Sequence, residues 1–287
     1  MHEVRPLQPD DVGRDGAGIL SAEDLLLKPY EYARNRVLDS IAEVGRIAML
    51  MGETCRMLVP GVRAFRLVVD QMNAIGVQSL LLVFIVSLFT GAVAAVQAAY
   101  QFANTVPLKF IGTVILRSTI IELGPVLTAL IVGGRVGASI AAELGTMRVT
   151  EQVDALEAMA INPVRYLVVP RVVAAIIMLP VLSMIANAVA IFGGYVVAVS
   201  SIGVSTHTYV LGLKQGFYMK DLYSGLIKAF FFGGFIAWMG CYYGFRTEGG
   251  AEGVGVATTR AVVASCVLVL IGDYVLANVL FRFIFAS

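Results

Sequence analysis

The sequence predicts an all-α integral membrane protein with five transmembrane helices. Of its 287 residues, 58% are hydrophobic and only 14% are charged, and the mean hydropathy is +0.83. A soluble domain carries about 25% charged residues, because it must cover its surface with polar groups. Strand-like alternation is absent, which favours a helical bundle over a barrel. With a formal net charge of only +1, the composition argues against a soluble enzyme, a disordered tail and a nucleic-acid-binding protein.

Five apolar stretches are long enough to cross a bilayer, which takes about 20 residues. They cover residues 73–108, about 110–142, 167–201, about 222–245 and 261–281. Nine Lys and Arg residues precede the first stretch, and further basic residues flank the second and fourth loops. Short loops rich in Lys and Arg stay in the cytoplasm. We therefore expect a cytoplasmic N-terminus and, after five crossings, a C-terminus on the outer side.

Two different segments precede the first span. Residues 1–33 are acidic and contain no apolar run, which argues against a cleavable signal peptide and an organelle transit peptide. In residues 34–66, apolar side chains recur every three or four positions with charged residues between them. This spacing predicts an amphipathic helix in the membrane interface, with a cytoplasmic helix packed on a partner as the alternative. Residues 67–287 then form the five-span domain.

The loop between the second and third spans contains a short acidic helix. Thr150 is a plausible N-cap, and Asn162-Pro163 ends the helix. Helical periodicity places apolar and acidic residues on separate faces, the former being Val153, Leu156, Met159 and Ala160 and the latter Glu151, Asp154 and Glu157. At about eleven residues it is too short to span a bilayer. We expect it to present a face to a cytoplasmic protein, the alternative being a solvated turn.

Glu122 is the principal candidate for chemistry inside the membrane. It lies about twelve positions into the second span, so it must face a wet cavity or a partner, or be protonated. Pro125 predicts a kink beside it. A purely structural helix–helix hydrogen bond is the alternative role.

The three cysteines and two histidines form no metal-binding pattern, and no phosphate-binding GxxxxGK[ST] loop is present. Any energy for work must come from a partner or an ion gradient.

A long ordered motif runs from Glu122-Leu-Gly-Pro through Glu143-Leu-Gly-Thr-Met-Arg and Thr150-Glu-Gln-Val-Asp-Ala-Leu-Glu-Ala-Met to Asn162-Pro-Val-Arg. Here, and over roughly residues 35–283, the chain resembles the MlaE/YrbE family of ABC-transporter permeases. One departure is visible, since many members carry Arg immediately before the Glu-Leu-Gly-Pro, where this chain has Ile121.

The resemblance implies a non-catalytic homodimeric permease that moves phospholipids or related lipids between the inner and outer membranes. Residues 150–162 would be the coupling helix, seated on a cytoplasmic P-loop ATPase, and a periplasmic hexamer of Mce-domain subunits would cover the opposite side. No cofactor or metal is implied. The implied contacts are Glu151, Asp154, Leu156, Glu157 and Met159 toward the ATPase, and Gln101, Phe102, Thr105 and Glu122 toward the lipid.

Two alternatives from other classes remain. An ion-coupled secondary transporter would use Glu122 and Asp273 for protons, although inverted repeats, which would favour such a carrier, are not evident. A membrane scaffold without transport would need no coupling helix.

Overall fold

The computed structural model describes residues 34, 38, 42–58, 65–102, 107 and 110–282, in two compact units that comprise residues 1–48 and 49–287. The acidic segment 1–33 lies outside the described residues. Residues 42–58 are helical, in agreement with the amphipathic pattern. Their expected place in the membrane interface stays a prediction, as does the division into segments 1–33, 34–66 and 67–287.

All five predicted spans are confirmed as helices long and apolar enough to cross a membrane, and the described residues contain no β-strand. The spans run over Phe65–Gln101, Ile111–Val149, Val164–Ser200, Met219–Phe245 and Gly250–Leu280. Their elements are α2 (Phe65–Ile75), η2 (Val77–Ser79) and α3 (Leu80–Phe102); α4 (Ile111–Ser118), η4 (Thr119–Leu123), α5 (Gly124–Val132), η5 (Gly133–Gly137) and α6 (Ala138–Val149); η6 (Val164–Val168) and α8 (Val169–Ser200); α10 (Met219–Phe245); and α11 (Gly250–Leu280). The first and last helices begin earlier than predicted, because a helix can continue past the apolar stretch into polar residues.

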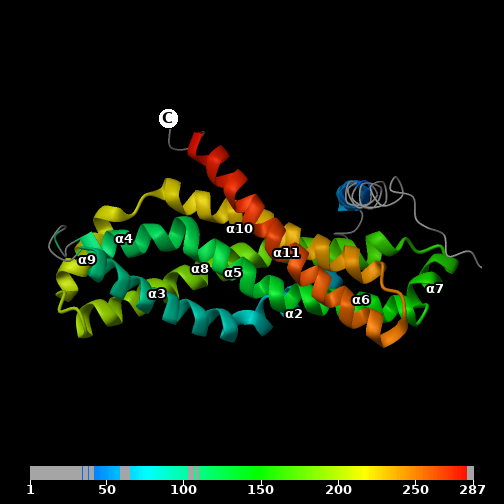
Figure 1. The fold of residues 1–287 in the computed structure, drawn as a ribbon, viewed down its shortest axis with the longest axis horizontal. Helices are drawn as coiled ribbons and strands as arrows, with labels where there is room; N and C mark the ends of the chain where they lie inside the picture. Colours follow the sequence, from blue (N-terminus) through cyan, green and yellow to red (C-terminus); the bar gives the residue numbers. More distant parts are fainter. Residues whose placement is uncertain are drawn as a thin grey trace, which may run out of the picture. The chain divides into compact units, whose positions relative to one another are not determined.

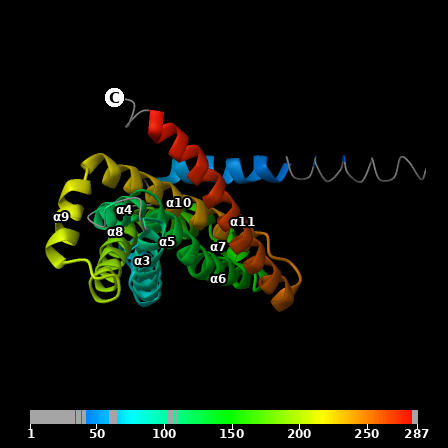
Figure 2. The same cartoon turned by 60° about the vertical axis from the view of Figure 1, so that its left-hand side comes forward.

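Within residues 49–287, the third and fourth spans form the centre of the bundle. Helix α8 packs against α2, α3 and α10, and α10 packs against α6 and α11 (Figures 1 and 2). Leu179 and Leu182 of α8 and Phe232 and Ile236 of α10 are fully buried in this core. Two short helices, α7 (Gln152–Ala158) and α9 (Thr206–Gly216), lie at opposite ends of the bundle (Figure 1).

Helix α9 is fixed to the bundle by Tyr209. Its hydroxyl donates a hydrogen bond to the carbonyl of Ile191 at 3.0 Å, and burial raises the pKa of Tyr209 above its usual value. At the start of the same helix, the Ser205 hydroxyl accepts a hydrogen bond from the Thr208 N–H at 3.2 Å.

Glycines allow neighbouring helices of the bundle to approach closely. A Cβ at Gly91 of α3 would overlap the carbonyl of Ala190 on α8. On α10, Cβ atoms at Gly240 and Gly244 would press against Ile140 and Leu144 of α6. The Gly240/Gly244 pair has the GxxxG spacing that lets helix backbones approach, and here it serves a contact between two helices of the same chain.

The second span contains two π-helical turns, η4 and η5. The proline at 125 accounts for the first. Pro125 has no N–H, so it cannot form the ordinary helical hydrogen bond to the carbonyl of Ile121. The preceding N–H, that of Gly124, donates to the carbonyl of Thr119, five residues back, and not to that of Ile120, four residues back. The kink predicted beside Glu122 therefore takes the form of a widened turn.

The turn η5 carries Arg135, which forms hydrogen bonds with the first span at η2, the short 3₁₀ turn between α2 and α3. The guanidinium donates to the carbonyl of Ala74 at 3.1 Å, to Ser79 Oγ at 2.7 Å and to Gln78 Oε1 at 2.8 Å. Such turns are frequent at functional positions of helices, and here each one carries a charged side chain to another span.

Candidate functional site

Charged residues from three spans meet in one cluster inside the bundle. Lys228 Nζ of α10 lies 2.6 Å from Glu122 Oε1 of η4 and 2.9 Å from Asp273 Oδ1 of α11. The Lys228 side chain is 1% exposed, whereas those of Glu122 and Asp273 are 44% and 23% exposed. Each residue lies seven to eleven positions from the α9 end of its span, or about 10–17 Å along the helix axis. The cluster therefore lies within the thickness of a bilayer.

The charges of this cluster do not balance. A fully buried ammonium needs an anionic partner, and two carboxylates supply more than it requires. With all three groups ionised, the cluster has a net charge of −1. The more exposed carboxylate, Glu122, is thus able to accept hydrogen bonds from a polar or cationic group that enters from the face of the bundle.

An apolar groove lies beside the segment that carries Glu122. Its volume is about 500 Å³, and its wall consists of Leu123 of η4 together with residues of α3, namely Ile85, Val86, Phe89, Thr90, Val93, Ala94 and Gln97. Glu122 precedes Leu123 in η4 but is not among the groove residues, and its carboxylate meets Lys228 of α10. The turn η4 thus contributes an apolar side chain to the groove on α3 and a carboxylate to the charged cluster.

The residues that the resemblance implied for lipid contact are only partly described. Glu122 is in the charged cluster, and Gln101 is exposed near the end of α3, one turn beyond the groove residue Gln97. Thr105 and the side chain of Phe102 lie outside the described residues. The assignment of this set to lipid binding stays a prediction.

The predicted acidic helix is present as α7, but it is shorter than the range 150–162. Thr150 is not its N-cap. Thr150 ends α6, its hydroxyl donates to the carbonyl of Thr146 at 2.8 Å, and Glu151 caps α7 with a left-handed backbone at φ 59°. The chain reverses direction directly after the second span, so the hydroxyl of Thr150 serves the helix that ends there and not the one that follows.

The faces of α7 divide differently from the sequence pattern. Val153 is buried and Leu156 packs against the core, whereas Met159, just past the helix, is 62% exposed. The Asp154 carboxylate forms an ion pair with Arg148 of α6. Met159 and Glu157 therefore offer more accessible contacts to a partner than Leu156 does.

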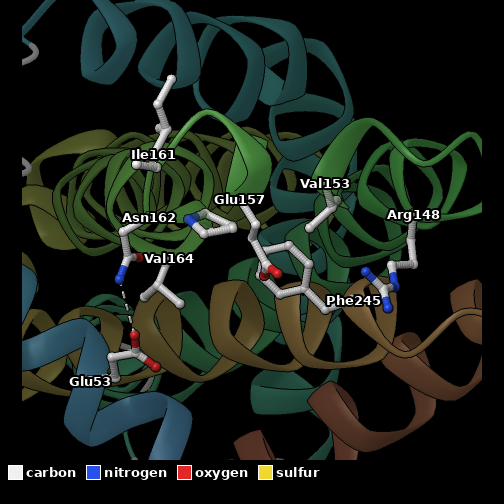
Figure 3. Close-up of a pocket in the computed structure, with 10 residues that line it drawn as sticks. Glu53, Arg148, Val153, Glu157, Ile161, Asn162, Val164 and Phe245 are labelled. Atoms are coloured by element: carbon white, nitrogen blue, oxygen red, sulfur yellow. Dashed lines mark hydrogen bonds between the residues drawn. The ribbon is translucent and has the colours of Figure 1, made fainter. Parts of the chain in front are cut away.

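A cavity of about 600 Å³ opens beside α7 (Figure 3). It is lined by Glu53 of the helical segment 49–58, by Arg148, by Phe245 at the end of α10, and by residues of α7 and the following turn, namely Val153, Glu157, Ala160, Ile161, Asn162, Pro163 and Val164. Asn162 Nδ2 donates to Glu53 Oε1 at 3.4 Å across one side of it, as the dashed line in Figure 3 shows. The cavity combines charged and apolar walls.

Sequence reasoning missed the ion pairs between spans. Lys228 and Asp273 are single charges in apolar spans, and the rule that such charges pair inside a bundle marks them as candidates for pairing without identifying the partner. Another ion pair joins the second and fourth spans. Arg117 Nε of α4 donates to Asp221 Oδ2 of α10 at 2.9 Å, and the Asp221 side chain is 2% exposed.

Comparison with known proteins gives a consistent match. The family model Permease MlaE matches residues 68–279. A probable ABC transporter permease of Rickettsia typhi is 45% identical over 216 residues, which is 75% of this chain and 83% of the relative. The intermembrane phospholipid transport system permease MlaE of Haemophilus influenzae is 36% identical over 249 residues, 86% of this chain and 95% of the relative. The chloroplastic protein trigalactosyldiacylglycerol 1 of Arabidopsis thaliana is 33% identical over 236 residues, which is 82% of this chain and 67% of the relative.

Proposed function

We infer the function of this chain from its family, because it belongs to the MlaE permease family. We propose that it is the membrane-spanning subunit of a bacterial ABC transporter. This transporter moves phospholipids between the inner and outer membranes. The name of the Haemophilus influenzae relative describes intermembrane phospholipid transport, and we extend that activity to this chain. The protein would lie in the inner membrane with its N-terminus in the cytoplasm and its C-terminus in the periplasm.

One observation carries the choice of substrate. The turn η4 carries both the half-exposed carboxylate of Glu122 and, as the next residue, Leu123, which forms part of the wall of the apolar groove on α3. A phospholipid has acyl chains for the groove and a polar headgroup for the carboxylate. The headgroup interacts with Glu122 while Lys228 keeps the carboxylate in place from the buried side.

The ATPase would bind at the α7 end of the bundle. The sequence has no P-loop of its own, and α7 with its adjoining cavity combines exposed Met159 with the charged residues Glu157 and Arg148. Motion of the ATPase acts directly on the second and third spans, because α7 connects them. A hexamer of Mce-domain subunits would cover the opposite end, where α9 lies.

A second copy of the chain would complete the transport pathway. Helices α3 and α11 leave large apolar side chains exposed along the membrane, among them Phe89, Val96, Leu270 and Ile271. The homodimer would place the two grooves and the two copies of Glu122 around a shared lipid site.

Reconstitution tests this function. The chain and its ATPase are placed in donor liposomes with a labelled phospholipid, and transfer to acceptor vesicles is followed with and without ATP. We expect ATP-dependent transfer, and none when the P-loop lysine of the ATPase is replaced. The purified chain alone should hydrolyse no ATP, because it lacks the phosphate-binding loop. Hydrolysis by the chain alone, or no lipid transfer by the complete system, would contradict the proposal.

An ion-coupled carrier is the second candidate, and the cluster of Lys228, Glu122 and Asp273 favours it because intramembrane titratable groups mark ion pathways in transporters. The same liposomes separate the two functions. A carrier would move substrate when a pH gradient is imposed without ATP, whereas an ABC permease would not.

A further inference from the structure

Two buried oxygen atoms between the second and third spans have no hydrogen-bond partner among the described residues. They are Thr119 Oγ1 on η4 and Asn187 Oδ1 on α8. Thr119 is 1% exposed and Asn187 is 6% exposed. Nearly all buried polar groups in proteins bind another protein group or an ordered water, so this pair requires a partner.

The two residues meet at the glycine that follows the π-helical turn. A Cβ at Gly124 would overlap Asn187 Oδ1 and would stand 2.9 Å from the carbonyl oxygen of Thr119. Asn187 therefore lies directly against the turn, and only glycine leaves room for it there. The Thr119 carbonyl is the acceptor of the long-range bond from Gly124 that defines η4.

A small cavity adjoins Thr119 and Gly124, and its other lining residues are Val86, Ser87, Thr90, Leu123, Leu127, Thr128, Ala186 and Ala190. Asn187 is not in this lining, but its Oδ1 lies against Gly124, which is. The volume of the cavity is about 10 Å³, which is close to the space that one water molecule needs. Four of the side chains around it carry hydroxyl groups, so polar atoms are present in a wall that is mainly apolar.

We propose that one water molecule binds at this place, accepting a hydrogen bond from the Thr119 hydroxyl and donating one to Asn187 Oδ1. A water matches both groups, since a hydroxyl without a partner needs an acceptor and an amide oxygen needs a donor. A metal cation would satisfy the oxygen lone pairs but could not accept the Thr119 proton.

The bound water makes Asn187 a positioning residue for Glu122. The turn η4 contains Glu122, which Lys228 of α10 holds at 2.6 Å. The water and Asn187 hold the same turn from α8. The widened turn is thus fixed between the third and fourth spans, and the Glu122 carboxylate is presented to the lipid-facing side in one place. This role for transport rests on the proposed function, whereas the water site itself does not.

Direct observation is the first test. In a structure of the nanodisc-embedded transporter at a resolution that shows ordered waters, we expect density within hydrogen-bond distance of Thr119 Oγ1 and Asn187 Oδ1. A direct bond between the Asn187 amide and the turn, with no density between them, would overturn the proposal.

A double-mutant cycle is the second test. Thr119→Val and Asn187→Leu should each lower the unfolding temperature, and the double variant should lose little more than either, because both changes remove the same water. Thr119→Ser should retain wild-type stability. Losses that simply add would show that the two groups share no partner.

The positioning role needs a readout at Glu122 itself. The infrared carboxyl band that disappears in Glu122→Gln identifies this residue, and we expect it to shift in Asn187→Leu. Ser183→Ala is the matched control, since Ser183 is another buried hydroxyl on α8 without a partner among the described residues. It should leave the band unchanged.

Transport gives the last comparison. Asn187→Leu should slow lipid transfer about tenfold, as a misplaced functional group does, while Ser183→Ala should not. An unshifted band in Asn187→Leu would remove the positioning role. Failure of the wild-type protein to move any phospholipid would instead contradict the proposed function and leave the water site standing.

Discussion

The ammonium of Lys228 lies 2.6 Å from the carboxylate of Glu122, although 106 positions separate the two residues in the chain. This contact joins the second span to the fourth. It also explains why the π-helical turn η4 can carry an ionisable group within the membrane, because a buried charge is tolerated where an opposite charge meets it. Four predictions follow from this contact and from the other features of the bundle.

Lys228 should be essential for stability. Lys228→Met leaves the carboxylates of Glu122 and Asp273 together without a cation, which should cost about 3–5 kcal/mol in the free energy of unfolding. Denaturant titration in mixed micelles measures this loss. The triple variant with Glu122→Gln and Asp273→Asn removes the surplus charges and should regain most of it. Wild-type stability of the single variant would show that the carboxylates do not depend on the lysine.

Glu122 should be needed for its charge. Glu122→Gln keeps the shape and hydrogen bonding of the side chain, whereas Glu122→Leu removes both. We expect both variants to assemble with the ATPase and to lose transfer of labelled phospholipid in reconstituted membranes. A functional Gln variant with an inactive Leu variant would reduce the role of Glu122 to a structural hydrogen bond. Full phospholipid transfer by the Glu122→Leu variant would show that Glu122 has no role in transport.

Helix α7 should carry the contact with the ATPase. Glu157→Lys reverses a charge in the wall of the adjoining cavity, and like charges brought together at an interface cost several kcal/mol. Co-purification with the ATPase should fall sharply, while folding stays intact because exposed substitutions cost little. Gln215→Lys, on the exposed surface of α9 at the other end, is the control. Equal yields of complex from both variants would show that α7 does not carry the contact with the ATPase.

The crossing of α3 and α8 should depend on Gly91. A methyl group there would overlap the carbonyl of Ala190, and such overpacking costs about 1–3 kcal/mol. Gly255→Ala is the matched control, because a Cβ at Gly255 meets no atom within 4 Å. The control should gain up to about 1 kcal/mol from helix propensity. Equal stability of both variants in thermal unfolding would mean that the helices separate easily at this point.

The sequence was sufficient to predict the elements of the bundle. The five spans and the acidic helix α7 were expected, and each is present. These features depend on properties of neighbouring residues, such as an unbroken apolar stretch or acidic and apolar residues at helical spacing. They are therefore visible without knowledge of how the spans pack.

The contacts of the candidate site depend on packing and were harder to predict. Which span Glu122 faces cannot be read from its own helix, so Lys228 and Asp273 remained separate observations. Pro125 indicated a distortion, but its form as a π-helical turn depends on the bond from Gly124 to Thr119. The second turn, η5, contains no proline, and no local signal predicts it. Thr150 was misassigned because it can cap either of two adjacent helices.

The separation of Glu122 and Lys228 along the chain has a consequence for biosynthesis. At about 5–20 residues per second, the ribosome completes Glu122 roughly 5–20 s before Lys228, which comes 106 residues later. During that interval the newly inserted second span has a carboxyl group and no ammonium to match it. Asp273 follows later still, so the three-membered ion cluster closes only when the final helix arrives. The ion pairs that join the second, fourth and fifth spans therefore form among the last events of membrane integration.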